Sequence, residues 1–453
     1  MEPKLILINP WIYDFAAYDL WSKPLGLLYL AGLLRSRGFE VHLLDCLDVY
    51  HPEMQDSPSM SPPLRRPYGT GKFWRKMVAK PPPLKHVPRS YSRYGISRQL
   101  FIKELQSIED PAAILVTSLM TYWYPGVQEV ISIAKETHPN APVILGGIYA
   151  RLCKEHALQH SGADYVASEG DPNDPSFILE IMDHFNIPAS KQSPDDGALP
   201  YPAFDRLRRI DYVCLLTSTG CPYRCQYCAS YFLNPTFYQR DPFHVLEEIL
   251  YWHGNYGVKD FAFYDDALLL QSDTHMAILL EKLISLDLNL RFHTPNALHV
   301  RGITHDMARL LHTSGFRTIR LGLETSDMEL HRDLGKKLSE GEFERAVYHL
   351  RKAGFSSEQI GVYILMGLPE QSVESVAETT DFVGRTGAMP YLAEYSPIPQ
   401  TPMWEMAQAH SDYELSSEPL FHNNTLLPCW DDDKRAKVPD LKKQVLEIRR
   451  SRT

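Results

Sequence analysis

The stretch Thr219-Gly220-Cys221-Pro222-Tyr223-Arg224-Cys225-Gln226-Tyr227-Cys228 places three of the chain's seven cysteines within eight residues, at the spacing C-x3-C-x2-C. The other four are scattered at Cys46, Cys153, Cys214 and Cys429. An isolated cysteine is usually a small buried hydrophobe, whereas a tight trio indicates a metal site. We call residues 219–228 the cysteine loop and expect it to bind metal.

An iron–sulfur cluster is the metal group that this spacing favours. Thiolates are the usual ligands of such clusters, and Cys221, Cys225 and Cys228 on one short loop suffice for three irons of a [4Fe–4S] cubane. The fourth iron then has no protein ligand and stays open to another molecule. A zinc site is the alternative, but it requires a fourth ligand. His253 and Cys214 are the nearest candidates, and neither stands at a zinc-finger spacing.

The region around the cysteine loop repeats a strand–helix pattern. Candidate strands begin near Tyr212, Lys259, Leu290, Arg317, Gly361 and Pro390, and amphipathic helices are expected near 241–254, 272–286, 304–314, 339–353 and 372–386. Six units are too few for a complete eight-unit barrel, so residues 201–400 predict a partial (β/α)6 barrel. The cysteine loop follows its first strand, where barrels place catalytic loops.

The N-terminal part predicts a separate α/β domain. Apolar strands are expected at 4–9, 41–45, 113–118, 143–147 and 164–167, with helices between them. This alternation is typical of a doubly wound, Rossmann-like sheet, which we assign to residues 1–190. A proline-rich insertion occupies about 51–110, a polar linker 186–202, and a C-terminal extension 401–453.

The cysteine loop, with Tyr227 just before its last cysteine, resembles the radical S-adenosylmethionine (SAM) superfamily. The resemblance implies that the open iron chelates SAM, and that one electron cleaves SAM to a 5′-deoxyadenosyl radical. Asp265 and Asp266 occupy the second strand end, where the family binds the SAM amino group. Glu324 ends Arg320–Glu324, which resembles the fourth strand of cobalamin-type members. Tyr227, Asp265, Asp266 and Glu324 are therefore expected cofactor contacts, although each carboxylate could instead cap a helix.

The N-terminal domain resembles the cobalamin-binding-type domain of class B radical SAM proteins. The resemblance rests on Asn9-Pro10, Pro24–Ala31, Gly146-Gly147 and Ser168–Asp171, and with the barrel it covers about residues 3–405. It implies cobalamin at the sheet's carboxyl edge, contacted by Tyr122, Trp123, Gly146 and Gly147. No Asp-x-His-x-x-Gly motif offers a cobalt ligand. In the alternative, the aromatic residues fill the crevice and exclude cobalamin.

The resemblance favours a cobalamin-dependent methyltransferase acting on an unactivated carbon of a small or lipid-like molecule. One alternative is a radical SAM cyclase, rearranging or oxidising enzyme without cobalamin. Another is a non-catalytic iron–sulfur redox protein, which would not need the acidic strand ends. The family also implies a one-electron donor such as a flavodoxin or ferredoxin.

The composition narrows the classes of partner expected for this chain. The net charge of −10 argues against nucleic acid, and no apolar run is long enough for a membrane span. The N-terminus lacks a signal-peptide layout, so we expect a cytoplasmic protein. Leu64 to Lys103 nevertheless holds eleven Lys and Arg and no Asp or Glu. This basic insertion indicates an anionic substrate, or else a solvated loop.

Overall fold

The computed structural model describes residues 2–54, 60–170, 174–189, 200–335 and 338–452. It divides into two compact units. The first comprises Met1–Asp211 with Ser417–Phe421, and the second Tyr212–Ser416 with His422–Thr453. The chain therefore divides after the linker. Most of that linker (190–199), and Asp171 of the cobalamin-type resemblance, lie outside the described residues.

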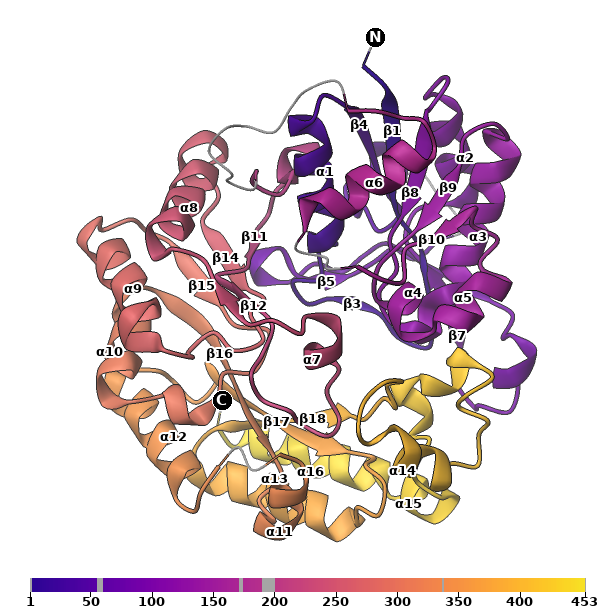
Figure 1. Cartoon of the computed structure of the whole chain (residues 1–453). Helices are drawn as coiled ribbons and strands as arrows, with labels where there is room; N and C mark the ends of the chain where they lie inside the picture. The colour runs from indigo at the N-terminus through magenta and orange to yellow at the C-terminus, as the bar shows by residue number, and fades with distance from the viewer. Residues whose placement is uncertain (1, 55–59, 171–173, 190–199, 336–337, 453) are drawn as a thin grey trace. The chain divides into compact units, whose positions relative to one another are not determined.

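The first unit is built on a five-stranded parallel sheet with the order β10-β9-β8-β1-β4 (Figure 1). The strands are β1 (Lys4–Asn9), β4 (Glu40–Asp45), β8 (Ala113–Val116), β9 (Val143–Leu145) and β10 (Tyr165–Val166). Helices α1 (Leu25–Ser36), α3 (Tyr124–Thr137), α5 (Lys154–His160) and α6 (Pro175–His184) alternate with them. Their apolar core includes Leu5, Leu7, Leu115 and Ile144. This is the predicted doubly wound, Rossmann-like fold.

The insertion contains ordered secondary structure. A three-stranded antiparallel sheet joins β2 (Ile12–Asp14), β7 (Tyr91–Tyr94) and β6 (Arg75–Val78), and β3 (Tyr18–Asp19) pairs with β5 (Gly71–Lys72). Helix α2 (Arg98–Gln106) ends this region. The aromatic residues Phe73 and Tyr94 of the insertion pack in a second core with Leu47 and Val49, which follow β4. The insertion therefore covers the carboxyl ends of β1 and β4.

The second unit is the predicted partial barrel. Its six parallel strands follow chain order: β11 (Val213–Leu215), β14 (Asp260–Phe263), β15 (Arg291–His293), β16 (Phe316–Glu324), β17 (Ile360–Met366) and β18 (Met389–Glu394). Helices α8 (Pro242–Tyr256), α9 (Met276–Ser285), α10 (His305–Thr313), α12 (Glu342–Ala353) and α13 (Val373–Thr386) separate them. Each strand begins within one residue of its predicted start, because buried apolar runs alternate with amphipathic helices.

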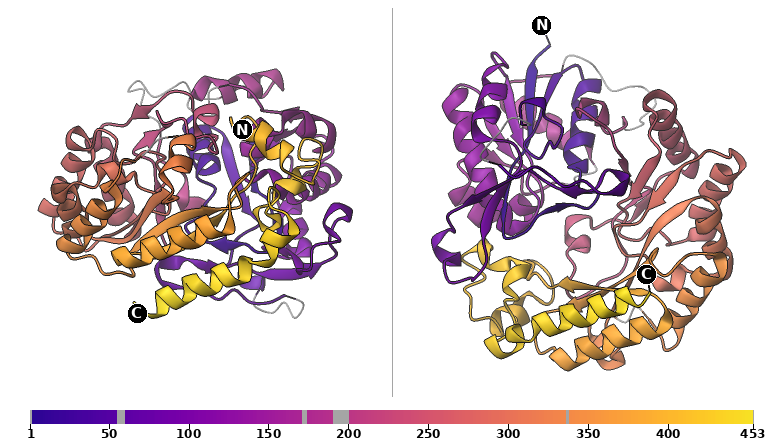
Figure 2. Two further views of the ribbon diagram at one scale, coloured as in Figure 1. Left: turned by 90° about the horizontal axis from the view of Figure 1, so that it is seen from below. Right: turned by 180° about the vertical axis from the view of Figure 1, so that it is seen from behind.

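The C-terminal extension is not a separate region. Helix α16 (Val438–Arg450) packs against β18 and α13, and Figure 2 shows it running along this side of the barrel. The Arg449 guanidinium donates to the Pro390 carbonyl at 2.8 and 3.0 Å, and Gln444 donates to the Ala377 carbonyl at 3.1 Å. The extension thus supplies the helix that follows the sixth strand.

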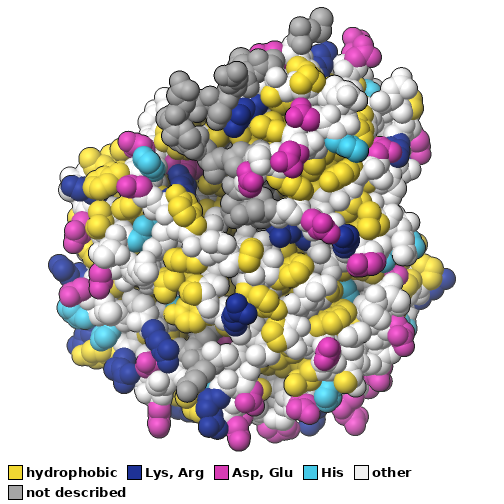
Figure 3. All heavy atoms as spheres, viewed as in Figure 1, with side chains coloured by type: hydrophobic (Ala, Val, Ile, Leu, Met, Phe, Trp, Pro, Cys, Tyr) yellow, Lys and Arg dark blue, Asp and Glu magenta, His cyan; other side chains and the backbone are white. Residues whose placement is uncertain are grey.

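Two surface features bear on the predicted partners: membrane-spanning helices and the distribution of charge. Among the described residues, no helix is both long and apolar enough to cross a membrane. On the face shown in Figure 3, acidic and basic side chains are interspersed, with no gathering by sign.

Candidate active site

The cysteine loop begins at the last residue of β12 (Ser218–Thr219) and ends just before α7 (Ser230–Leu233) of the barrel unit. Cys225 is buried, while Cys221 and Cys228 are half-buried. The Cys228 N–H donates to the Cys225 carbonyl at 3.1 Å, and the Ser230 N–H donates to Cys228 Sγ at 3.5 Å. Burial raises the pKa of Cys221 to about 11, and the nearby Asp266, Cys225 and Cys228 act in the same direction. The three thiols are therefore neighbours.

A second segment supports the loop from the side. Gly335 has a φ of +135°, and a Cβ there would lie 3.2 Å from Cys225 Cα. The Gln226 N–H donates to the Leu334 carbonyl at 3.2 Å. A side chain at position 335 would therefore displace the loop. Sequence reasoning missed Gly335, because no motif marks a close approach by a distant segment.

The donor set fits a cluster better than a single zinc ion. His253 Nδ1 contacts the Val258 carbonyl at 2.8 Å, and Cys214 is fully buried within β11. In the described ranges, no three Cys, His, Asp or Glu side chains converge as ligands of one ion would. Three thiols on one loop remain, which is the arrangement that a [4Fe–4S] cluster with an open iron requires.

The acidic pair after β14 divides into two different environments. Asp265 is buried, and its Oδ1 accepts hydrogen bonds from the backbone and hydroxyl of both Thr217 and Ser218 at 2.6–3.0 Å. Asp266 is half-buried and lies close enough to Cys221 to influence its pKa. Burial raises the pKa of both carboxyl groups. The two carboxylates thus differ in burial and in hydrogen bonding, and contact of either with SAM stays a prediction.

Tyr227 and Glu324 come together from separate elements. Burial, followed by the negative charge of Glu324, raises the pKa of Tyr227 well above its usual value. Glu324 ends β16 with a φ of +69° and is buried. A Cβ at Gly322 would lie 2.9 Å from Glu324 Oε1, so the carboxylate folds back over that glycine. Neither residue caps a helix; Tyr227 is part of the cysteine loop, and Glu324 lies beside it.

The aromatic residues after β8 pack into the first unit. Tyr122 is buried, and the Trp123 indole donates to Asp14 Oδ2 at 2.7 Å. Tyr124 stacks on Tyr149 with ring centroids 5.8 Å apart. Tyr122 therefore has little surface to offer a corrin ring. The half-buried Trp123 packs against the core that includes Phe73 and Tyr94 of the insertion. Contact of Tyr122 or Trp123 with cobalamin stays a prediction.

The carboxyl ends of β8 and β9 remain accessible. Ser118 Oγ donates to the Gly146 carbonyl at 2.6 Å and so joins the two strand ends. A Cβ at Gly146 would meet only Ala167, at 3.9 Å, whereas one at Gly147 would lie 2.3 Å from the Ser118 carbonyl oxygen. Met120 and Ile148 are exposed beside them. Sequence reasoning missed these two residues, since an exposed aliphatic side chain carries no motif.

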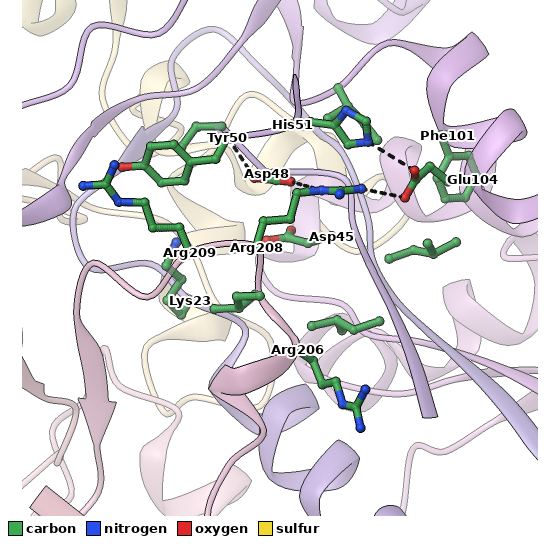
Figure 4. A pocket seen from close by; sticks show the side chains of 15 residues that line it. Lys23, Asp45, Asp48, Tyr50, His51, Phe101, Glu104, Arg206, Arg208 and Arg209 are labelled. Carbon is green, nitrogen blue, oxygen red and sulfur yellow. Dashed lines mark hydrogen bonds and ion pairs between the residues drawn. The ribbon is translucent and has the colours of Figure 1, made fainter. Parts of the chain in front are cut away.

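A cavity of ≈ 240 Å³ lies elsewhere in the first unit, beyond the end of β4 (Figure 4). The Arg208 guanidinium bridges Asp48 and Glu104, at 2.9 Å from each, and His51 contacts Glu104 at 3.2 Å. The charged walls therefore largely neutralise one another. None of the predicted site residues lines this cavity.

Residues 215–383, which include the cysteine loop and strands β14 to β17, match the model of the radical SAM superfamily. The chain therefore contains a radical SAM domain. Residues 96–176 match the B12 binding domain, and this range contains β8, β9 and their open carboxyl ends. The first match implies SAM and a [4Fe–4S] cluster, and the second implies cobalamin. The predicted family and cofactors are confirmed.

Relatives of this radical SAM protein include named methyltransferases. An uncharacterized methyltransferase of Pyrococcus horikoshii is 23% identical and aligns over 70% of this chain and 74% of its own length. Cytidylyl-2-hydroxyethylphosphonate methyltransferase of Streptomyces wedmorensis is 20% identical over 85% of this chain and 77% of its own.

Solved structures agree on the fold. The radical SAM methyltransferase TsrM of Kitasatospora setae, with tryptophan and a SAM analog bound, gives a TM-score of 0.67 at 16% identity. The match covers 98% of this chain and 89% of TsrM. A second TsrM structure, with cobalamin and a [4Fe–4S] cluster, gives a TM-score of 0.63 at 18% identity and covers 91% and 76%.

Proposed function

We propose that this protein is a cobalamin-dependent radical SAM methyltransferase that modifies an unactivated carbon of a small or lipid-like molecule. The observation that carries the proposal is the presence of both domain types in one chain. Relatives named as methyltransferases, aligned over most of this chain, support it. The cluster and SAM supply a hydrogen-abstracting radical when bound, and cobalamin supplies the methyl group.

The cysteine loop provides the residues for the cluster. Cys221, Cys225 and Cys228 would ligate three irons as thiolates, which the iron stabilises against the effect of burial. Burial also keeps water away from the site. The chain itself supplies ligands, orientation and exclusion of solvent, whereas the bound groups supply the radical chemistry.

Asp266 is the residue that we assign to the SAM amino group. A half-buried carboxylate near Cys221 offers an ammonium ion an opposite charge in a medium of low dielectric constant. Tyr227 lies within range of Cys225, Cys228 and Glu324. We assign Tyr227 and Glu324 to the wall that shapes the SAM site.

The open strand ends of the first unit are the surface that we assign to cobalamin. Gly146 leaves backbone accessible, and the exposed Met120 and Ile148 offer apolar contact to a large flat ring. Gly147 serves the fold by its contact with Ser118. Tyr122 and Trp123 support this surface from within.

The decisive experiment separates methyl transfer from cobalamin-free radical chemistry. Anaerobically reconstituted protein is incubated with hydroxocobalamin, desalted, and supplied with SAM and a low-potential reductant. A methyltransferase retains cobalamin and forms both 5′-deoxyadenosine and S-adenosylhomocysteine. Formation of 5′-deoxyadenosine without cobalamin retention or S-adenosylhomocysteine would overturn the proposal in favour of a cyclase, rearranging or oxidising enzyme.

The substrate and the electron donor require separate experiments. Mass spectrometry of small molecules from a deletion strain should reveal the accumulated unmethylated substrate, which differs from the wild-type product by one CH2. A flavodoxin or ferredoxin as donor, an anionic substrate and a cytoplasmic location all remain predictions.

A further inference from the structure

The segment just before the cysteine loop is held by a buried carboxylate. Asp265 Oδ1 accepts from the Thr217 N–H at 3.0 Å, the Thr217 hydroxyl at 2.7 Å, the Ser218 N–H at 2.6 Å and the Ser218 hydroxyl at 2.7 Å. Asp265 is only 2% exposed. A buried carboxylate is costly unless hydrogen bonds compensate it, so these four donors account for its presence.

The carbonyl groups of the same segment are held by Arg240, which follows β13 (Tyr238–Gln239). The Arg240 guanidinium donates to the Leu216 carbonyl at 2.7 Å. The backbone N–H of Arg240 donates to the Thr217 carbonyl at 2.9 Å. The same guanidinium forms an ion pair of 2.7 Å with Glu248, which is fully buried in α8. Donors and acceptors of residues 216–218 are thus engaged by two separate carboxylates, one of them acting through Arg240.

These contacts close the base of the cysteine loop. Strand β12 pairs with β13 (Tyr238–Gln239), matching Ser218 with Gln239 and Thr219 with Tyr238. Arg240 follows β13 directly, so the two ends of the segment 219–238, which contains the cysteine loop, meet where Asp265 and Glu248 act. Because a closed base limits the conformations of the chain between its ends, the cysteines have fewer arrangements to sample before cluster binding.

We propose that Asp265 and the Arg240–Glu248 pair are positioning residues that hold the cysteine loop in its cluster-binding form. The inference rests on assigning the cluster to Cys221, Cys225 and Cys228. It does not depend on methyl transfer. It separates two adjacent carboxylates that the sequence alone presents as equivalent.

The test compares three variants after anaerobic reconstitution: D265N, the double variant T217V/S218A, and D266N. Iron per chain and the electron paramagnetic resonance signal of the reduced cluster are measured before and after addition of SAM. The T217V/S218A variant removes the two hydroxyl donors and leaves the Asp265 carboxylate in place. T380V is the matched control, because Thr380 is a buried hydroxyl bonded to the Val376 carbonyl within α13.

We expect D265N and T217V/S218A to bind at most half of the wild-type iron and to broaden the signal before SAM is added. T380V should bind iron as the wild type does. D266N should retain iron but need at least ~10-fold more SAM for the same spectral change, as expected on loss of a charge-assisted contact. An unchanged SAM response in D266N would remove only the assignment of Asp266.

Normal iron binding by T217V/S218A, together with a D265N variant that loses only its SAM response, would overturn the inference and return Asp265 to the SAM site. If D265N does not fold, the series S218A, T217V and T217V/S218A replaces it. A stepwise fall in iron per chain supports the positioning role of Asp265, whereas constant iron across the series refutes it.

Discussion

The cysteine loop of the barrel unit and the open strand ends of the first unit are built in opposite ways. The first gathers its three ligands within eight residues and fixes them with buried polar contacts. The second draws Met120 from the segment after β8, and Gly146 and Ile148 from the segment after β9, and offers backbone and aliphatic surface. A site defined by reactive groups is visible in sequence, whereas a site defined by shape emerges only after folding.

Both regions also show that neighbouring residues of one type can have different roles. Asp265 is saturated by hydrogen bonds while Asp266 remains half-buried near Cys221. Gly147 is constrained by Ser118 while Gly146 has open space above it. In each pair we assign one residue to the fold and propose the other as a ligand contact.

The largest expected effect comes from removing the cluster ligands. Changing Cys221, Cys225 and Cys228 together to Ala should lower iron from about four per chain to nearly none, because no thiolates remain to hold the cubane. SAM cleavage should disappear with it. Iron analysis and absorbance measure the loss. Single Ala variants of Cys46, Cys153 and Cys429, which are buried, are the controls and should retain the cluster. A full cluster in the triple variant would contradict the assignment.

The next effect separates fold from ligand at the strand ends. Gly147→Val should destabilise the protein by about 3 kcal/mol, because it combines a left-handed φ of +93° with a clash against Ser118. Gly146→Val should change stability by less than about 1 kcal/mol. It should nevertheless reduce retention of hydroxocobalamin through desalting, because the new side chain occupies the space of the ring.

Thermal unfolding and the cobalamin spectrum measure these two properties for each variant. Equal cobalamin retention by Gly146→Val and the wild type would place the cofactor elsewhere or exclude it. A Gly147→Val variant as stable as the wild type would contradict the structural role of that glycine.

Much of the architecture was predictable, because the spacing of apolar residues along the sequence follows which side chains are buried. The six barrel strands and the Rossmann-like strands are apolar runs whose pattern is local. The positions of Tyr122 and Trp123 were not predictable, since an aromatic run suits a core and a ligand platform equally. Gly335 and Arg240 were also missed, because their roles depend on contacts between segments distant in the chain. The insertion's strands pair with β2 and β3 across similarly long separations.

A smaller effect on the stability of the first unit should follow from lowering the pH. Burial, with the charge of His160 adding to it, lowers the pKa of His156 from 6.5 to about 4. The folded form therefore favours neutral His156, whose Nδ1 lies 2.7 Å from the Tyr149 hydroxyl. Stability from this group is complete above pH 6.5 and is lost as the pH falls towards 4. Because the ring is partly exposed, we expect about 1–2 kcal/mol.

Hydrogen exchange of peptides covering α5 measures this loss between neutral and acidic pH. H156Q removes the titrating group and should flatten the dependence, while the other residues of the unit still titrate. An equal loss of protection in H156Q would assign the pH dependence to other groups.

The smallest effect concerns the basic insertion, where the contrast between structural and ligand-facing residues applies again. Arg65 forms an ion pair of 2.8 Å with buried Asp19, so R65E should destabilise the fold. Arg66, Lys72, Arg75 and Lys76 are exposed and have no carboxylate partner among the described residues. Reversing these four charges should raise the KM for an anionic substrate about 3- to 10-fold at low salt, with the difference shrinking at high salt because exposed charges are screened. Equal kinetics at both salt concentrations would identify the four as solvated surface charges, leaving Arg65 as the residue of this set with a structural role.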